Sequence, residues 1–298
     1  MPTYWAFRAG DSRGWAAEDA GRLEVFHPSA SSTRHALAGQ TADQVLRQVY
    51  GGALVVEETE VEPGCYYPRV WRPEKPGARV VERDAWAAAA AAARIIFSRL
   101  GDVLRFVEPD PNNLLAFGHE LRMLLILACT EVESSWTGVL KANRYPAGKW
   151  TTNDYVKLLK PMKLDEWSVE LAPALPLGAL KPFAGWSGTA ATQTLPWYDA
   201  YNKVKHFRED NLPLATLRHT IDAVAAVYVM FVVQFGTWEG FGAGDISLLI
   251  FQGHNPREIA AGGDLFRLRD EPTFAPGEIY APPRVAGRHS WRPAMLIL

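Results

Sequence analysis

The part of this chain richest in side chains capable of chemistry is WYDAYNKVKHFRE, residues 197–209. Asn202 and His206 stand four residues apart, so on a helix both side chains would point to one place. A neutral histidine can act as a general base or acid, and the positive charge of Lys205 can stabilise a phosphate or its transition state. This is the combination that a metal-independent ribonuclease requires.

A long helix predicted at residues 114–142 would have to face this stretch. It is largely apolar, yet Glu133 and Arg122 lie on a polar line along it, and polar groups on a buried helix need partners. The predicted catalytic set is therefore His206, Asn202, Lys205, Glu133 and Arg122. The alternative is that Asn202 and His206 only hydrogen-bond to the long helix and lock the bundle.

A second candidate site is the basic stretch at residues 141–163. It contains six lysines and arginines but only one acidic residue, Asp154. The aromatic residues Tyr145, Trp150 and Tyr155 are interleaved with them. Cations attract phosphates and aromatic rings stack on bases, so this pattern favours RNA binding. The predicted RNA contacts are Lys149, Trp150, Lys157, Lys160 and Arg208. The alternative is an ordinary solvated helix face.

Composition excludes several classes of protein. The 298 residues are 48% hydrophobic and 21% charged with a net charge of −2, which is ordinary for a globular chain with no overall attraction to nucleic acid or membranes. The two cysteines form no CxxC pair and no histidines have metal-ligand spacing. We therefore expect a cytoplasmic protein without a cofactor, metal or membrane partner.

The predicted fold is mainly α. Helical periodicity predicts a bundle at residues 85–237, preceded by a small α+β segment at 1–84 and followed by a short β-containing tail at 238–298. Its longest apolar run, residues 223–235, is too short to span a membrane comfortably and predicts a buried helix. In the tail, a strand is predicted at residues 246–251.

Antiparallel helices with a polar motif ending in His at the start of the last helix pair resemble the bacterial HEPN superfamily. The resemblance covers at most residues 85–237. It implies a ribonuclease in toxin–antitoxin or phage-defence systems, or a non-catalytic module that binds RNA or a protein partner; a homodimer is also expected. The Arg that precedes the family's His is absent, since residues 199–201 are DAY. His206 carries over, with Asn202 as a looser match. YNKVKHFRE also looks like a motif of uncharacterised bacterial proteins.

The N-terminal FRAGDSRG, residues 7–14, resembles the first-strand motif of toxin-type ADP-ribosyltransferases. That resemblance implies that Arg8 supports an NAD pocket and that Glu60 and Glu62 complete the site. The competing interpretation is a loop closed by Asp11 and Arg13. Three functions thus stay open: an RNA- or protein-binding HEPN-like module, an NAD-using transferase, and a structural interaction protein without catalysis.

Overall fold

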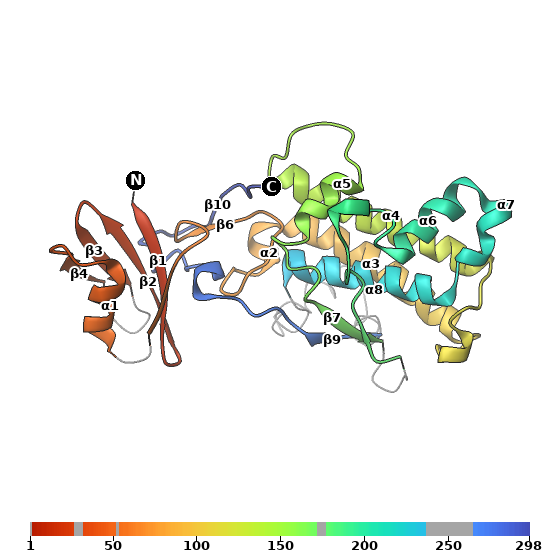
Figure 1. Cartoon of the computed structure of the whole chain (residues 1–298), viewed down its shortest axis with the longest axis horizontal. Helices are drawn as coiled ribbons and strands as arrows, with labels where there is room; N and C mark the ends of the chain where they lie inside the picture. Colours follow the sequence, from red (N-terminus) through yellow and green to blue (C-terminus); the bar gives the residue numbers. More distant parts are fainter. Residues whose placement is uncertain (1, 27–31, 52–53, 172–176, 237–264) are drawn as a thin grey trace. The chain divides into compact units, whose positions relative to one another are not determined.

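The computed structural model describes residues 2–26, 32–51, 54–171, 177–236 and 265–298 (Figure 1). The chain divides into two compact units. One contains residues 1–76 together with 273–296, and the other contains residues 77–272 with the last two residues. The strand predicted at residues 246–251 lies outside the described residues.

The first unit is built on a five-stranded antiparallel sheet with the order β4-β3-β2-β1-β5. Its elements are β1 (Thr3–Ala9), β2 (Ser12–Asp19), β3 (Arg22–Phe26), β4 (Thr33–Ala36), α1 (Ala42–Tyr50) and β5 (Leu54–Glu58). Gly10 and Gly21 have positive φ angles of 59° and 73°, which glycine adopts at little cost and which tight hairpins use. These turns let the first three strands pair in succession.

This sheet corrects the prediction of a mainly α fold, because the protein is mixed α/β. Among the strands that local reasoning missed is β2, SRGWAAED. Alanine and acidic residues are depleted in strands, so the segment resembles a loop when it is considered alone. It forms a strand because it pairs with β1 on one side and β3 on the other.

Alternate residues of the sheet bury opposite faces, as strand geometry requires. On one face Phe7, Ala16 and Leu23 pack against Val45 and Leu46 of α1. Thr41 begins α1 with a capping box: its side chain accepts the Gln44 N–H, and the Gln44 side chain accepts the Thr41 N–H. This face and its helix follow the periodicity of the sequence.

The other face is covered by the C-terminal residues 273–296. Ile279 and Ala281 pack on Ala6 and Trp15, and the two-stranded pair β6 (Cys65–Tyr66) and β10 (Arg292–Pro293) runs parallel beside them. A 3₁₀ turn at Pro276–Glu278 precedes β10 in this segment. Residues 273–296 therefore belong to the sheet unit.

Glu62 binds two arginines of this C-terminal segment and so fixes it to the rest of the sheet unit. Its carboxylate accepts hydrogen bonds from the Tyr4 hydroxyl at 2.8 Å, from Arg288, and from Arg292 at 3.1 Å. The Arg288 hydrogen bond, aided by the one from Tyr4, holds the pKa of Glu62 below its ordinary value of 4.5.

Glu62 should therefore make the stability of this unit depend on pH. Because its folded pKa is depressed, its stabilising contribution is present above the unfolded pKa and is lost as pH falls through the folded pKa. Between about pH 5 and 3, we expect the loss of unfolding free energy to be smaller in Glu62→Gln than in wild type. Urea melts across that range measure it, with Glu58→Gln as the control. Parallel pH profiles for wild type and Glu62→Gln would contradict the assignment.

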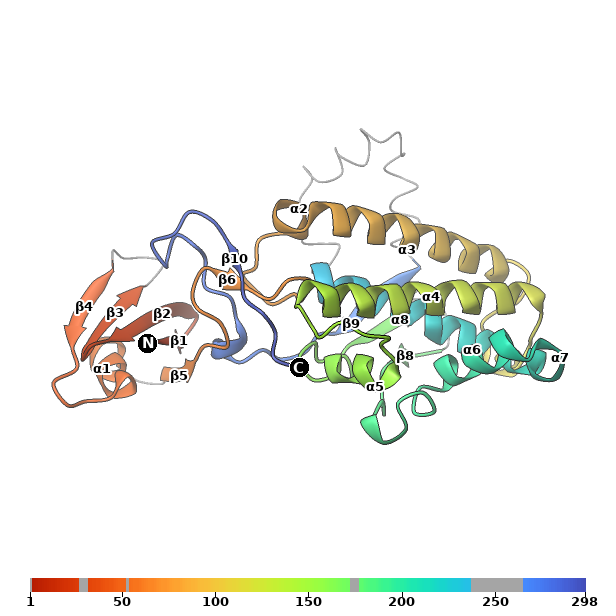
Figure 2. The same cartoon turned by 90° about the horizontal axis from the view of Figure 1, so that it is seen from above.

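The second unit is mainly helical (Figure 2). Its longer helices are α3 (Arg83–Leu104), α4 (His119–Ala142), α6 (Pro196–His206) and α8 (Leu217–Phe235). The short elements are α2 (Ala78–Val81), α5 (Thr152–Tyr155), α7 (Arg208–Asn211) and the antiparallel strands β7 (Ser168–Leu171), β8 (Ala179–Leu180) and β9 (Phe266–Asp270). Within the unit α3 runs beside α4, and α8 packs against α3, α4 and α6.

The central helix α8 is capped by Thr216, whose side chain accepts the His219 N–H at 3.1 Å. Every described side chain from Ala223 to Phe235 is buried, which confirms the buried helix predicted from the apolar run. By length and composition α4 and α8 could both cross a membrane, but 50% and 83% of their apolar windows lie inside the protein. The core helix of a soluble protein passes the same test, so this is weak evidence for a membrane.

Candidate functional site

The predicted catalytic stretch forms α6, which packs on α4. Pro196 occupies the first turn of α6, where its missing N–H costs nothing. Trp197, Tyr198, Tyr201 and Val204 are buried, at the spacing of one helical face. The sequence thus directs two phenol groups of α6 into the protein interior.

Both phenols meet Glu133 of α4. The Tyr198 hydroxyl donates a hydrogen bond to Glu133 Oε1, and the Tyr201 hydroxyl lies 3.5 Å from Glu133 Oε2. Lys205 Nζ donates to the Tyr201 hydroxyl at 2.8 Å and lies 4.9 Å from the centroid of the same ring. A chain of donors therefore runs from Lys205 through Tyr201 to Glu133.

The protonation of this network is fixed by burial and charge. Burial, and next the hydrogen bond to Glu133, raise the pKa of Tyr198. Burial also raises the pKa of Tyr201, although Lys205 opposes it. The hydrogen bond to Tyr201 raises the pKa of Lys205. At neutral pH the tyrosines are protonated donors and Lys205 is a cation, so neither phenol is available as a nucleophile.

The other predicted catalytic residues have separate surroundings. Arg122 donates from Nε and Nη2 to the backbone carbonyl of Val204, at 3.2 and 3.1 Å, and Asn202 donates to the carbonyl of Tyr198 at 3.0 Å. His206 is exposed at the end of α6. No hydrogen bond or ion pair among the described residues joins His206 to Glu133 or Arg122.

The arrangement therefore ties α4 to α6 through Glu133 and Arg122. Of the predicted set, Glu133 and Lys205 both contact Tyr201, whereas His206 makes no hydrogen bond or ion pair with either of them among the described residues. Sequence reasoning missed Tyr198 and Tyr201. Two features of the sequence could have predicted them. Glu133 is a carboxylate on a largely apolar helix and needs nearby donors, and the opposite helix carries two tyrosines three residues apart.

The predicted RNA-binding stretch forms a hollow of about 460 Å³ in the same unit. Its lining residues are Thr137, Lys141, Tyr145, Ala147, Gly148, Trp150 and Tyr155. Trp150 is held in place because its Nε1–H donates to the carbonyl of Pro146 at 2.8 Å. The centroids of the Trp150 and Tyr145 rings lie 6.0 Å apart, and the two ring planes are inclined by 57°. The hollow thus presents fixed aromatic groups.

Cations surround this hollow. Lys149 and Lys157 are exposed, and Lys157 Nζ donates to the Tyr145 hydroxyl and lies 4.9 Å from the ring centroid. The one nearby carboxylate, Asp154, already caps α5 at Thr151 and accepts from Tyr145. These hydrogen bonds position the Asp154 carboxylate, and within the described residues no ion pair joins it to Lys149 or Lys157.

Of the predicted RNA contacts, only Trp150 is among the described residues that line this hollow. Lys160 is paired with Asp165 at 2.7 Å, so part of its charge is neutralised locally. Arg208 lies in α7, and its side chain is outside the described part of the protein. The site that the structure assembles from the sequence prediction therefore consists of Trp150, Lys149 and Lys157, joined by Tyr145 and Lys141.

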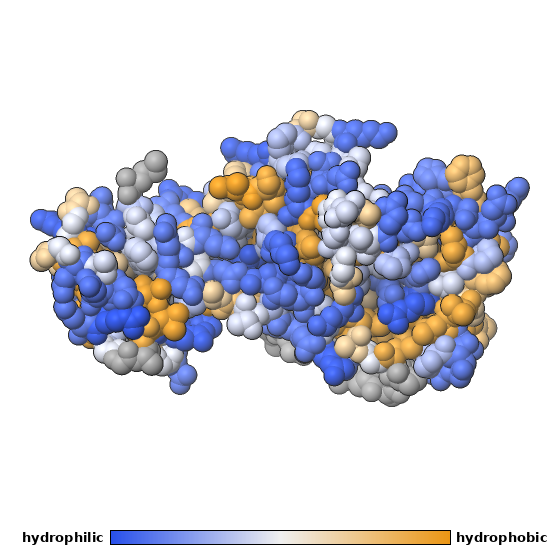
Figure 3. Space-filling model, viewed as in Figure 1, coloured by the Kyte–Doolittle hydropathy of each residue, from blue (hydrophilic) through white to orange (hydrophobic). Residues whose placement is uncertain are grey.

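A larger apolar groove of about 940 Å³ lies between the end of α3 and the start of α4. Phe106 and Phe117, which line it, are 86% and 53% exposed. On the face drawn in Figure 3, further apolar side chains are visible on the surface of the helical unit. Exposed apolar surface of this kind is typical of interaction sites, so this is where the predicted alternative of a protein partner, or of a homodimer, would be tested.

The two glutamates of the predicted NAD site have partners other than Arg8 in the sheet unit. Glu62 is occupied by Tyr4, Arg288 and Arg292, and Glu60 lies 3.7 Å from Arg72. Neither lines the small hollow beside Arg8. The geometry of these residues therefore does not support the transferase that the N-terminal motif implied.

Comparisons of the chain with protein-family models, curated proteins and solved structures gave no match.

Proposed function

We propose that the protein binds single-stranded RNA through the hollow formed by Tyr145, Trp150 and Tyr155. The observation that carries this proposal is that fixed aromatic groups and Lys141 line one hollow, with the exposed Lys149 and Lys157 beside it. Bases of any sequence stack on such rings, and lysines attract the phosphates between them. Binding of this kind needs neither a metal nor a cofactor.

The size of the hollow fits this role. About 460 Å³ lies within the range of small-ligand sites, so it can accept a base together with its sugar. Lys141 lines the hollow and Lys149 lies next to Gly148 in its wall. Phosphates on either side of a stacked base would therefore pass close to positive charge.

We also propose a cytoplasmic location, because Cys65 and Cys129 are both buried free thiols, which suits a reducing compartment.

That the protein is a HEPN-like ribonuclease in bacterial defence remains a prediction. Its central residue, His206, is exposed at the end of α6, away from the proposed RNA-binding hollow. RNA binding and RNA cleavage can therefore be tested separately.

The test is fluorescence anisotropy of a labelled single-stranded RNA with the full chain. Because base–aromatic stacking contributes about 1–3 kcal/mol per base, Trp150→Ala should weaken binding by about 5- to 150-fold. Lys149→Gln should weaken binding uniformly across RNA sequences and lower its salt dependence. A single-stranded DNA of the same sequence shows whether the sugar matters.

Matched variants in the same unit control this test. Phe106→Ala removes an exposed aromatic ring far along the chain from the hollow, and Lys203→Gln removes an exposed lysine of α6; both should bind as wild type does. If wild type does not bind, or if Trp150→Ala binds equally well while remaining folded, the proposal fails. Gel analysis of the same mixtures with wild type and His206→Ala tests cleavage: equal cleavage, or none, removes the nuclease prediction.

A further inference from the structure

The sheet unit contains a second feature that the proposed RNA-binding hollow does not involve. Arg8 of β1 lies directly opposite Arg13 of β2, and Ala6 lies opposite Trp15. Because side chains alternate along a strand, these four residues share one face of the sheet. It is the face covered by Ile279 and the C-terminal segment, opposite to α1.

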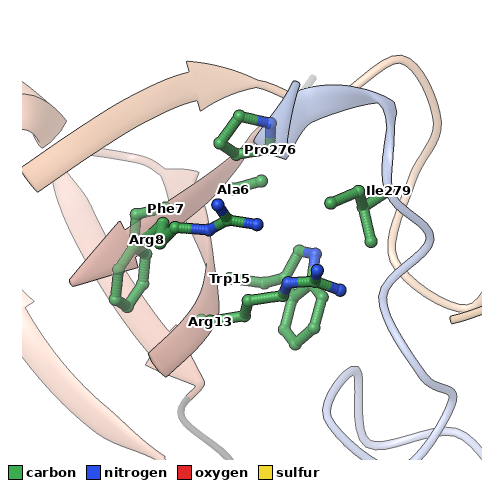
Figure 4. Close-up of a pocket in the computed structure, with 8 residues that line it drawn as sticks. Ala6, Phe7, Arg8, Arg13, Trp15, Pro276 and Ile279 are labelled. Carbon is green, nitrogen blue, oxygen red and sulfur yellow. The ribbon is translucent and has the colours of Figure 1, made fainter. Parts of the chain in front are cut away.

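These residues enclose a small hollow. Its lining is completed by Phe7, Gly14, Pro276 and Ile279, and its volume is about 10 Å³. That volume is close to the lower limit for one water-sized atom. Figure 4 shows the guanidinium groups of Arg8 and Arg13 and the indole nitrogen of Trp15 turned toward the space below Pro276 and beside Ile279.

One of these polar groups is buried without a partner. Trp15 is 3% exposed, and its Nε1–H has no hydrogen-bond acceptor among the described residues. A buried donor left unpaired costs about 1–3 kcal/mol. Figure 4 places this nitrogen at the edge of the hollow, so an acceptor atom seated there would satisfy it.

The two guanidinium groups indicate that this acceptor carries a negative charge. Like charges directly opposite on neighbouring strands destabilise a sheet. Arg13 forms an ion pair with Glu74 at 2.9 Å, which offsets part of its positive charge. Arg8 has no ion pair or hydrogen bond within the described ranges. On the adjacent strand Glu57 is paired with Ala6 and accepts the Gly277 N–H at 3.3 Å, and no ion pair links it to Arg8 in the described part of the chain.

We propose that this hollow binds a phosphate group, with one oxygen seated against Trp15 Nε1 and the others held by Arg8 and Arg13. Guanidinium groups hydrogen-bond phosphate in a fixed, often bidentate geometry. A tetrahedral oxyanion offers acceptors in several directions, which suits donors converging from two strands. The enclosed volume admits a single oxygen, so the rest of the ligand lies outside, where Arg8 is exposed.

The test is NMR of the full chain labelled with ¹⁵N. The Trp15 indole signal, assigned as the one missing from Trp15→Phe, is followed while sodium phosphate replaces sodium chloride at constant ionic strength. We expect a saturable shift of that signal. Since hydrogen bonds to charged groups contribute about 1.5–3 kcal/mol, Arg8→Gln and Arg13→Gln should each raise the apparent Kd by about tenfold or more.

Arg34→Gln is the matched control. Arg34 lies on β4 of the same sheet and is 76% exposed, so this variant changes the net charge equally and should bind phosphate as wild type does. A Trp15 signal that does not respond to phosphate overturns the proposal. So does an equal loss of affinity in Arg34→Gln and Arg8→Gln, which would show only a response to net charge. A phosphomonoester added in place of inorganic phosphate distinguishes the source: equal or tighter binding indicates the terminal phosphate of a small molecule, and weaker binding indicates the free ion.

Discussion

Replacing Trp136 by alanine should lower the free energy of unfolding by about 3–5 kcal/mol, the usual cost of removing a buried tryptophan. Trp136 of α4 is fully buried. Its ring centroid lies 5.0 Å from that of Trp186, 5.1 Å from Tyr155 and 5.5 Å from Tyr198. It therefore joins the Glu133 network to the aromatic hollow, and its loss leaves a cavity between them.

A pair of phenylalanine variants separates packing from hydrogen bonding. Trp136 Nε1 has no partner among the described residues, so Trp136→Phe loses volume only. Trp197 Nε1 donates to the Pro182 carbonyl at 2.8 Å, so Trp197→Phe also leaves a buried acceptor unpaired, at an additional cost of about 1–3 kcal/mol. Urea denaturation of the three variants measures these differences. A cost of about 0.5 kcal/mol or less for Trp136→Ala, the range of surface substitutions, would contradict the packing argument.

The second large effect is expected at Gly277 in the sheet unit. A Cβ atom there would lie 2.2 Å from the carbonyl oxygen of Glu58, and two hydrogen bonds hold the backbone in place. The Glu60 N–H donates to the Gly277 carbonyl at 2.9 Å, and the Gly277 N–H donates to Glu57 at 3.3 Å. Because the obstacle is backbone, Gly277→Ala should destabilise the unit by about 1–3 kcal/mol or more.

Hydrogen exchange localises that effect. In Gly277→Ala we expect faster amide exchange in β1 and β5, which pack against the turn at Pro276–Glu278, and unchanged exchange in α8. The control is Gly101→Ala within α3, where a Cβ meets no atom within 4 Å; it should be neutral or stabilising by up to about 1 kcal/mol. Unchanged exchange in β1 and β5 would show that the C-terminal segment is not held as described.

The sequence alone predicted the two long apolar helices α4 and α8. The apolar run at residues 223–235 predicted the buried part of α8, and the periodicity at 114–142 predicted α4, although the structure begins that helix at His119. It also indicated the aromatic and basic character of the hollow at Trp150. These features are local: helical periodicity and composition within a short stretch specify them.

Only the tertiary structure decided the sheet unit and the surroundings of the candidate residues. β2 is a strand because of its neighbours, and Gly277 bonds to Glu57 across 220 positions of sequence. Glu133 meets Tyr198 across 65 positions, and Arg8 meets Arg13 through strand register. Non-local pairing leaves no periodic signal, since it depends on which surfaces are buried together and on donors supplied by distant segments. The sequence therefore named Glu133, His206 and Arg8 as capable of chemistry, while folding joined Glu133 to two tyrosines, left His206 exposed and placed Arg8 beside Trp15.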